Sequence, residues 1–495
     1  MKKALLLILT IAIAILPLSA CKKNNDEYSV LSYWVDAEGD VQGADGDKDS
    51  NASGTTSGGS TTGGNSTTGG NSNNGGNSTT GGSSKPISTN LNELKGKTYT
   101  IAIHGTKEQL STAAKATYSA FESKYGCKLE LHTTDFNTYT AQVSRRQSTG
   151  DPFDILLIHG SFFPAITIAG AAEDLSGAIA ALKPKSNIES ATKMFNWKDT
   201  KTGKTGSYGF CNNKCLTPYL MYYNKLLFQD AGLEDPLELY NKGQWTWDKI
   251  LEMGRYVADN DTSGTYFMGK QFLPVCFMGA QSIYINDDGV PVNNVRDPLI
   301  RSALEIHQKL FTGNKPMGMP GSATTEDYIT YFPKGMCYMV AEESTKYADL
   351  APAAKSSMAM GKSDKNLGIV PFPENSKHLY PTGWYTAYGA GTGADPRIPV
   401  LFGEFASTYN SPVKGADDLK GDNLKLVNNL LKKDLLPNRH GSYQGSGNIT
   451  TLSLYDKLRG QVITGTDITK AINDIAPQMD ACLEATVGKG NYISK

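Results

Sequence analysis

The chain has almost no net charge and, beyond its first twenty residues, no long apolar run. It carries 48 Lys and Arg residues against 49 Asp and Glu residues in 495. This balance gives no electrostatic reason to expect nucleic acid or an anionic membrane surface as a partner. No later segment offers the run of about 18–20 apolar residues that a membrane-spanning helix needs. The length and the 39% apolar content instead predict two or three domains with large cores.

The motifs of the common catalytic and nucleotide sites are also missing. Gly203-Lys204-Thr205 resembles the end of a phosphate-binding loop, but Lys198 stands where the first glycine of that loop should be. GAGTG at 389–393 follows a predicted strand without the other features of a dinucleotide site. The sequence contains no Gly-x-Ser-x-Gly and no HExxH motif. We therefore expect a protein that is not an enzyme and has no cofactor, although the paired carboxylates of a glycosidase would leave no such motif.

Metal sites are not expected either. The acidic stretch DGDKDS at 45–50 has neither the glycine nor the glutamate that a calcium loop needs at its sixth and twelfth positions. Cys211 and Cys215, spaced CNNKC, have no second Cys or His pair at zinc-ligand spacing. In an exported protein these two thiols can form a small disulfide loop. The alternative is that they are isolated core thiols, as we expect for cysteines 127, 276, 337 and 482.

The N-terminus has the pattern of an export signal. Lys2 and Lys3 precede the apolar stretch ALLLILTIAIAILPL, which ends in Leu-Ser-Ala-Cys. This ending resembles the lipobox of bacterial lipoproteins, in which the thiol, here that of Cys21, is diacylated. We expect a signal peptide at 1–20 and a mature protein that is anchored by lipid to the outer face of the bacterial cytoplasmic membrane. An ordinary anchor with a chance cysteine is the alternative.

A disordered tether is predicted for residues 21–96. Its section 54–86 is nearly pure Gly, Ser, Thr and Asn, a composition that cannot build a core. About 60 such residues would have a root-mean-square span of roughly 45 Å. The tether would let a globular body move near the membrane while the lipid holds it there.

The globular body starts with the pattern of an α/β domain. TYTIAIH at 98–104 alternates like a strand, the next helix ends at Gly126, and KLELHT and DPFDILLIHG follow as strands. The second of these is continuously apolar, which is typical of a strand buried on both faces of a parallel sheet. Ligands of such sheets bind beyond the carboxyl ends of the strands. The turns after these strands, at 105–106 and 159–161, are therefore candidate walls of a site.

Six later segments match a known family in order and spacing. They are SYGFCNNKCLTPYLMYYNKLLFQDAGL (207–233), GQWTWDKILEMGRYV (243–257), YFPKGMCYMVAEES (331–344), KNLGIVPFPE (365–374), PTGWYTAYGAG (381–391) and TLSLYDKLRGQVITGTDITKAINDI (451–475). Together they resemble the sugar-type extracellular solute-binding proteins, the cluster similar to maltose-binding protein. From the residues alone, Tyr222 and Tyr223 are predicted to be sheet core, Gly232 a helix C-cap and Thr246 an N-cap.

The resemblance implies a two-lobe α/β fold of the periplasmic-binding-protein type II, with hinge crossings between discontinuous lobes. We expect a first lobe from 97–210 and 371–412, and a second from 211–370 and 413–495. The resemblance also implies a monomeric receptor that performs no catalysis. Such a receptor delivers a small solute, most simply a sugar, to the permease subunits of an ABC importer. A surface polysaccharide-binding lipoprotein without a transporter and a tethered glycosidase are the alternatives.

A sugar site needs aromatic rings that stack on C–H faces and polar groups that pair with hydroxyls. For Trp384 a stacking platform and inter-strand core are both open. AEESTKY at 341–347 lacks the tryptophan that many family members have there, so the cargo is not specified further. The candidates at strand ends and predicted crossings are His159, Asn212, Asn213, Tyr219, Gln271, Phe272, Glu342, Glu343, Trp384 and Tyr385.

Overall fold

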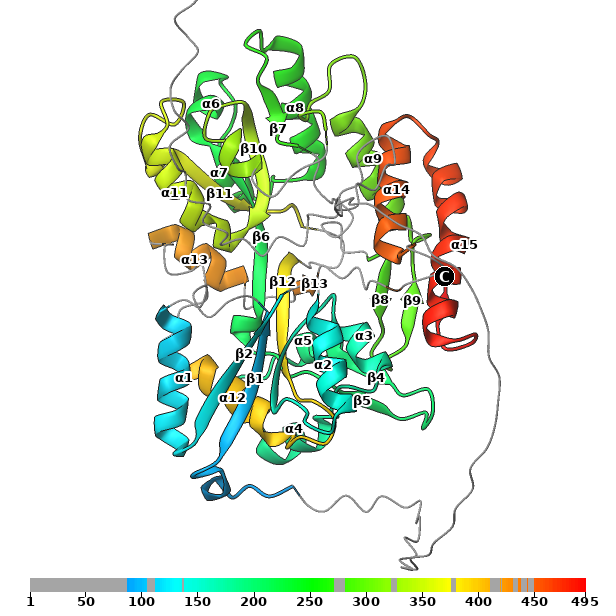
Figure 1. Ribbon diagram of the computed structural model, residues 1–495. Helices are drawn as coiled ribbons and strands as arrows, with labels where there is room; N and C mark the ends of the chain where they lie inside the picture. The colour runs from blue at the N-terminus through cyan, green and yellow to red at the C-terminus, as the bar shows by residue number, and fades with distance from the viewer. Residues whose placement is uncertain are drawn as a thin grey trace, which may run out of the picture.

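The computed structural model describes residues 87–104, 112–135, 138–270, 281–321, 327–374, 380–409, 419, 421–430, 435–437, 443 and 449–495. The predicted signal peptide, Cys21 and most of the predicted tether lie outside these residues. Two bodies lie one above the other in Figure 1, joined by long strands. We call the body built on β1, β2 and β3 the first lobe, and the body built on β7, β10 and β11 the second lobe.

One mixed sheet of nine strands passes through both lobes. Its order is β2-β1-β3-β12-β6-β10-β7, with β11 paired to β6 and β13 paired to β12. β1 is parallel to β2 and β3, whereas β12 is antiparallel to β3 and β6. The strands are β1 Thr98–His104, β2 Lys128–Thr134, β3 Ile155–His159, β6 Leu216–Asn224, β7 Tyr266–Met268, β10 Cys337–Glu343, β11 Leu367–Pro371, β12 Tyr380–Gly389 and β13 Leu435–Pro437.

Helices cover both faces of the first-lobe sheet, as the apolar strands predicted. Ile101 and Ile103 of β1 pack with Phe121 of α1 and Phe402 of α12, whereas Ala102 between them belongs to a second apolar cluster. This alternation follows from the two-residue period of a strand. The first-lobe helices are α1 Thr112–Tyr125, α2 Tyr139–Ser148, α3 Phe163–Ile168, α4 Ser176–Leu182, α5 Glu189–Thr192 and α12 Arg397–Thr408.

The tyrosine pair of β6 lies in the core of the second lobe, which confirms the prediction. Both side chains are fully buried, and they enter different clusters on the two faces of the sheet. The hydroxyl of Tyr222 donates to the carbonyl of Glu343 at 2.8 Å, and that of Tyr223 donates to the carboxylate of Asp235 at 2.8 Å. Each ring therefore fills core volume while its polar end is satisfied.

Local helix signals in this lobe are also confirmed. Asn224 caps α6 by accepting from the Leu226 amide at 3.1 Å, and Gly232 follows that helix with a φ of 67°. Thr246 caps α8 by accepting from the Lys249 amide at 3.2 Å. The second-lobe helices are α6 Lys225–Asp230, α7 Pro236–Asn241, α8 Trp247–Asn260, α10 Asp327–Thr330, α11 Tyr347–Ser356 and α13 Gly421–Leu430.

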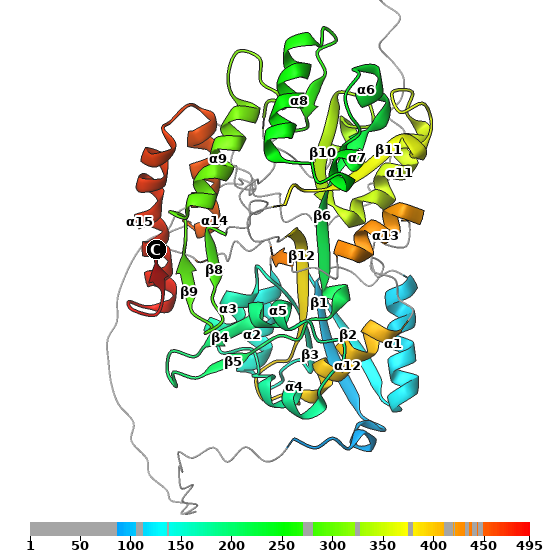
Figure 2. The ribbon, with the colours of Figure 1, turned by 180° about the vertical axis from the view of Figure 1, so that it is seen from behind.

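A lateral group of elements stands beside the two lobes (Figures 1 and 2). Leu304 of α9 shares an apolar cluster with Leu458 of α14 and Phe163 of α3, whereas Leu310 and Phe311 of α9 join the cluster of α8 and β6. The C-terminal helices, predicted to belong to the second lobe alone, thus share a core with the first. The group comprises β8 Ile283–Ile285, β9 Pro291–Asn293, α9 Pro298–Phe311, α14 Thr451–Ile463, α15 Ile468–Val487 and β14 Ile493–Ser494.

A small hairpin and five 3-10 helices complete the described elements. The hairpin, which belongs to the first lobe, pairs Trp197 with Gly206. These elements are β4 Asn196–Lys198, β5 Thr205–Ser207, η2 Leu91–Leu94, η4 Lys193–Phe195, η5 Asn213–Cys215, η7 Ser344–Lys346 and η8 Asp364–Asn366. No helix among the described residues is long and apolar enough to span a membrane.

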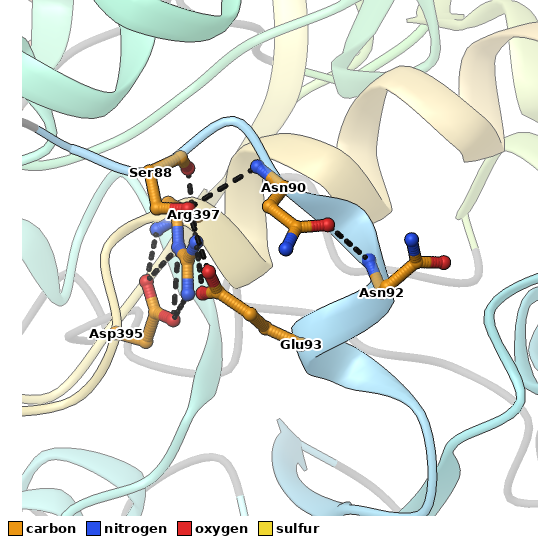
Figure 3. Close-up of polar contacts among 6 residues, drawn as sticks. All are labelled: Ser88, Asn90, Asn92, Glu93, Asp395 and Arg397. Carbon is orange, nitrogen blue, oxygen red and sulfur yellow. Dashed lines mark hydrogen bonds and ion pairs between the residues drawn. The ribbon is translucent and has the colours of Figure 1, made fainter.

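Residues 87–96, predicted to be the end of the tether, pack on the folded body, which corrects that boundary. Leu94 of η2 is fully buried against the first lobe. Figure 3 shows the guanidinium of Arg397, from α12, between Asp395 and Glu93. Its Nη1 donates to Glu93 Oε2 and to the carbonyl of Ser88, each at 2.9 Å. The segment 87–96 is therefore held on the lobe by contacts that composition alone does not reveal.

Candidate functional site

The two lobes meet where β6 changes its partners. Pro218 of β6 lies opposite Thr382 of β12, and the very next residue, Tyr219, lies opposite Glu343 of β10. Residues 216–218 thus belong to the first-lobe part of the sheet, and residues 219–224 to the second. The crossing lies later than the predicted boundary at 210/211, because Cys211 is still packed inside the first lobe.

Several candidate residues lie along this junction. His159 ends β3 and precedes a turn, and its backbone lies opposite Thr386 of β12. One residue before Thr386, Tyr385 lies opposite Leu216 of β6. The four central strands β3, β12, β6 and β10 therefore bring backbone positions from four distant parts of the chain to the boundary between the lobes.

The orientation of the His159 ring is fixed by its own turn. His159 is 5% exposed, and its Nδ1 accepts from the Ser161 amide at 3.2 Å and lies 2.7 Å from Ser161 Oγ. Because a backbone amide can only donate, Nδ1 is the acceptor and the neutral ring carries its proton on Nε2. The one N–H donor of the neutral His159 ring is therefore Nε2–H, and this nitrogen is buried. The edge of the ring also packs on Phe162, with ring centroids 5.5 Å apart.

The structure separates the candidate carboxylates Glu342 and Glu343. Neighbouring residues of a strand point to opposite faces, and residues directly opposite on paired strands share a face. Glu343 therefore shares its face with Tyr219, and Glu342 shares the other face with Leu220. Glu343 is buried and accepts from Thr345 Oγ1 at 3.2 Å, whereas Tyr219 and Glu342 are half-buried. A ligand surface on one face of the sheet can include Tyr219 and Glu343. A ligand surface on the opposite face can include Glu342.

Charge at the end of β10 acts on the buried Tyr222. Burial raises the pKa of Tyr222 well above its usual range, and the negative charges of Glu342 and Glu343 add to that rise. The Tyr222 hydroxyl therefore stays protonated and remains a donor to the Glu343 carbonyl. This bond fixes the backbone of the strand end that carries both carboxylates.

Asn212 has a packing role in the structure. It is fully buried, and its Nδ2 donates to the carbonyl of Gly403 in α12 at 2.6 Å. Its Oδ1 lies 3.5 Å from the Cys215 Sγ. The next residue, Asn213, begins η5 and is exposed. The buried amide thus ties the turn before β6 to α12.

The disulfide between Cys211 and Cys215 is not formed, and the alternative of buried core thiols is what the structure has. Neither cysteine is in a disulfide, and both thiols are buried in the first-lobe cluster. The Cys215 Sγ accepts from the Asn212 amide at 3.4 Å. The thiols are thus part of the packing of the turn that precedes β6.

The remaining candidates are described only in part or not at all. Gln271 and Phe272 lie outside the described residues. Trp384 and Tyr385 have a described backbone in β12, but their side chains are outside the description, so the choice between platform and core for Trp384 stays a prediction. No group of three or more His, Cys, Asp or Glu side chains in the described part of the chain is arranged to hold a metal ion.

The sequence did not reveal one further group beside β10. The Lys346 Nζ lies over the ring of Tyr328, 5.0 Å from its centroid, and the Tyr328 hydroxyl donates to Asp349 Oδ2 at 2.8 Å. Lys346 follows Glu343 by three residues, in η7. The three-residue spacing between Glu343 and Lys346 is the one signal in the sequence that could have indicated that Lys346 lies beside the junction.

Comparison with known proteins identifies the fold. Among the similar solved structures are an ABC substrate-binding protein from Listeria monocytogenes in complex with cycloalternan, with 16% identity, a TM-score of 0.53 and coverage of 78% of this chain and 99% of that one. The galacto-N-biose-/lacto-N-biose I-binding protein from Bifidobacterium longum has 10% identity, a TM-score of 0.56 and coverage of 80% and 98%. The sugar-binding protein MalE from Xanthomonas citri has 12% identity, a TM-score of 0.57 and coverage of 78% and 97%.

These likenesses confirm the predicted two-lobe, type II periplasmic-binding-protein-like fold. A search of curated proteins gave no match. The family model for bacterial extracellular solute-binding proteins matches residues 116–395, which is more than half of the chain. Such proteins bind solutes rather than transform them, and they act outside the cell. The chain belongs to the family of bacterial extracellular solute-binding proteins.

Proposed function

We propose that this protein is the receptor of an ABC importer and that its cargo is a sugar or an oligosaccharide. Family membership supports solute capture, and similar folds have been solved with carbohydrates, among them cycloalternan and lacto-N-biose. The single observation that carries the proposal is the junction itself. Four adjacent strands bring His159, Tyr219, Glu343 and the backbone of residues 384–385 to the boundary between the lobes.

The chemistry of these groups suits a polyol. A sugar hydroxyl both donates and accepts, so its desolvation requires partners of both kinds. His159 Nε2–H is a donor, the carboxylate of Glu343 is an acceptor, and the ring of Tyr219 can pack against C–H groups. We place the sugar between the lobes, against these side chains and those of Trp384 and Tyr385.

The lobes of this proposal follow the predicted ranges with two changes. The first lobe takes 87–218 and 371–412, because 87–96 and 211–218 pack with it, and the second takes 219–370 and 413–495, with the C-terminal helices packed on the first lobe as well. Closure would be a hinge rotation about β6 and the segment that returns from β11 to β12. The receptor would act as a monomer and perform no chemistry of its own.

A screen of melting temperature across mono- and oligosaccharides, with the mature full-length protein, tests the cargo. A sugar at 100 times its dissociation constant should add about 2.7 kcal/mol to the free energy of unfolding. A response to another solute class, with no sugar active, would remove the carbohydrate assignment. Release of product from an oligosaccharide would favour the glycosidase, and retention of polymer without a response to small sugars would favour the polysaccharide binder.

Two variants connect a sugar response to the junction. Glu343→Gln keeps the shape of the side chain and removes its charge, so it should weaken binding of the active sugar by about 1–3 kcal/mol. Tyr256→Ala, at an exposed residue of α8, is the control and should bind like the wild type. Equal affinity of both variants would move the site away from Glu343.

The proposed lipid anchor has its own test. Cys21→Ala should abolish acylation, and the protein should then leave the membrane fraction or remain unprocessed. A variant that is cleaved after residue 20 and still sediments with membranes would contradict the anchor. This outcome would leave the binding function unaffected.

A further inference from the structure

The two ends of the nine-stranded sheet differ in how they are covered. At the second-lobe end, the amides of Phe267 and Met268 in β7 donate to the carbonyl of Met317 at 2.9 and 3.1 Å. At the first-lobe end, β2 is the last strand, and no described strand pairs with its outer edge. An uncovered strand edge is a template for a further extended segment. The outer edge of β2 is therefore a candidate docking surface.

This outer edge is blocked at its start and open further along. The Lys128 amide donates at 2.9 Å to the residue just before β1, so it points inward. The next amide, that of Leu129, points outward and donates to Glu122 Oε1 at 2.7 Å. Main-chain groups alternate in direction along a strand, so the N–H and C=O groups of Leu131 and Thr133 also point outward. These four groups are the ones that an added strand can bond.

Positive charge surrounds the amino end of β2. Three segments meet there, because the Gly96 amide donates to the Gly126 carbonyl at 2.7 Å and a Cβ on Gly126 would lie 3.1 Å from the Lys95 Cγ. Glu93, the acidic residue nearest to Lys95 in sequence, is already bound to Arg397. The exposed lysines of these segments, which we call the lysine cluster, are Lys95, Lys97, Lys124 and Lys128. The cluster favours an acidic partner.

One stretch of the chain before Ile87 suits both the edge and the lysine cluster. Residues 28–35, YSVLSYWV, are rich in β-branched and aromatic side chains and contain neither Gly nor Pro. Both alternating faces of this stretch carry apolar side chains, which fits a strand that is covered on both sides. Acidic residues follow it at 36, 38 and 40. Their charges complement the lysine cluster and oppose adsorption to an anionic membrane surface.

We propose that residues 28–35 dock on the outer edge of β2 as an antiparallel strand. This direction places the acidic residues 36–40 beside the lysine cluster. It also leads the chain back toward residues 87–97, which lie at the end of the first lobe where β1 begins (Figure 1). A Gly/Ser-rich linker of about 50 residues, such as 36–86, has a root-mean-square span of roughly 40 Å, so the stretch can reach β2 at a high effective concentration.

Docking shortens the tether. With residues 28–35 on β2, only residues 22–27 separate the proposed lipid on Cys21 from the first lobe, and six extended residues reach about 20 Å. The receptor is then held close to the membrane while the stretch is docked and reaches farther when it is released. This inference goes beyond solute capture and does not depend on the cargo, and the docking itself does not depend on the lipid.

Hydrogen exchange in the mature full-length protein, residues 21–495, tests the docking. A docked strand protects the amides of Leu131 and Thr133, whereas an open edge leaves them to exchange. Leu31→Pro removes a main-chain donor and interrupts the added strand, so exchange at these two amides should accelerate by about tenfold or more. Val41→Pro, which lies outside the stretch, is the matched control and should exchange like the wild type.

Charge reversal tests the contact with the lysine cluster. Lys95→Glu/Lys124→Glu should accelerate exchange at Leu131 by about two- to fivefold. Lys115→Glu/Lys334→Glu changes the net charge equally at exposed positions away from the cluster and should have no effect.

Two results would overturn the docking. One is equal exchange at Leu131 and Thr133 in the wild type and in Leu31→Pro. The other is protection of residues 28–35 that arises only when phospholipid vesicles are added, because it would assign the stretch to the membrane surface. Neither measurement uses a sugar, so a failed sugar screen and a failed docking test are separate outcomes.

Discussion

Two arginines of this protein are buried beside an aspartate, yet their surroundings differ. Arg397 has a side chain 10% exposed, and its guanidinium binds both oxygens of Asp395, Glu93 and the carbonyl of Ser88. Arg459 of α14 has a side chain 4% exposed, and its Nη2 lies 3.7 Å from Asp456 Oδ1, beyond a good hydrogen bond. One buried charge is thus fully engaged by carboxylates, and the other is close to a carboxylate without a strong bond to it.

The pKa values of the neighbouring groups record this difference. Burial alone would raise the pKa of Asp395, but its hydrogen bonds with Arg397 outweigh burial and place it below the usual range. Burial of the Asp456 carboxyl raises its pKa to about 6, although the positive charge of Arg459 acts to lower it. Burial, with Arg459 adding, lowers the pKa of His307 well below its usual range, and no described group hydrogen-bonds either of its ring nitrogens. Proximity of an opposite charge therefore outweighs the cost of burying a carboxylate at Asp395, where the geometry also allows hydrogen bonds, and not at Asp456.

The largest effect should come from Arg397. We expect Arg397→Ala to lower the free energy of unfolding by about 2–4 kcal/mol, because it leaves Asp395 uncompensated and frees the segment 87–96. The partial exposure of Glu93 and Asp395 keeps the loss below that of a wholly buried pair. Urea unfolding measures the loss, and limited proteolysis should show new cleavage within 87–96. Arg397→Lys is the control and should lose less; equal stability of Arg397→Ala and wild type would contradict the network.

A pH dependence should distinguish Asp456 from Asp395. Between pH 4 and 6 the folded state holds a proton on Asp456 that the unfolded state has released, so the wild type loses stability as pH rises through this window. Asp456→Asn removes this loss. The stability of the variant relative to the wild type should therefore increase by roughly 2 kcal/mol from pH 4 to pH 6 and level off above about pH 7.

The free energy of unfolding of the variant must be compared with that of the wild type at each pH. The reason is that His307 contributes a pH dependence of the opposite sign in both proteins. Its lowered pKa makes the unfolded state bind the proton first, so that stability is lost as pH falls below about 6.5. Thermal unfolding of both proteins across the range supplies the measurement. A difference that is flat with pH would mean that Asp456 titrates normally in the folded protein.

Replacing the poorly bonded pair as a whole should have a smaller effect. We expect the double variant Asp456→Leu/Arg459→Met to be between unchanged and about 2 kcal/mol more stable than the wild type at pH 7, because it removes two desolvated charges. Asp456→Leu alone should be destabilising, since the buried Arg459 then loses the carboxylate that neighbours it. Urea unfolding of the three proteins provides the test, and a double variant less stable than the single one would show that the pair is net favourable.

The smallest effect should occur at Ser88, within the engaged network. Ser88→Ala removes the exposed hydroxyl bond to Glu93 Oε1 but keeps the main-chain carbonyl that accepts from Arg397. We expect a change within about 0.5 kcal/mol. Urea unfolding of Ser88→Ala and Arg397→Ala, measured side by side, tests this expectation. A loss of stability in Ser88→Ala as large as that in Arg397→Ala would mean that the Ser88 hydroxyl, and not the guanidinium, supplies most of the stabilisation.

Local signals were sufficient for many elements of the fold. Gly232 follows α6, Thr246 caps α8, and Tyr222 and Tyr223 of β6 lie in the sheet core, all as predicted. These features depend on residues a few positions apart, so their physical causes are visible in a short window of sequence. The candidate site was predictable only as a set of strand ends, among which His159 and Ser161 form a local contact.

Long-range contacts explain what the sequence alone could not show. The boundary of the tether was placed too late because Glu93 is held by Arg397, 304 residues further along the chain. Asn212 fits the pattern of a ligand-binding side chain, yet its amide binds Gly403, 191 residues away. Glu342 and Glu343 look like a pair in sequence, whereas the pleat of β10 sends them to opposite faces.

The sequence by itself determined that this is an α/β solute-binding protein with an export pattern, because apolar periodicity, caps and the order of motifs are properties of neighbouring residues. Only the tertiary structure decided how closely each of the two buried arginines meets its aspartate, at which residue β6 passes from the first lobe to the second, and that the turn at Gly289 rests on a hairpin of the first lobe. Each of these depends on distances between segments that are remote in the chain. Burial and hydrogen-bond geometry, which set the energy of a charge or a polar group, exist only once those segments have met.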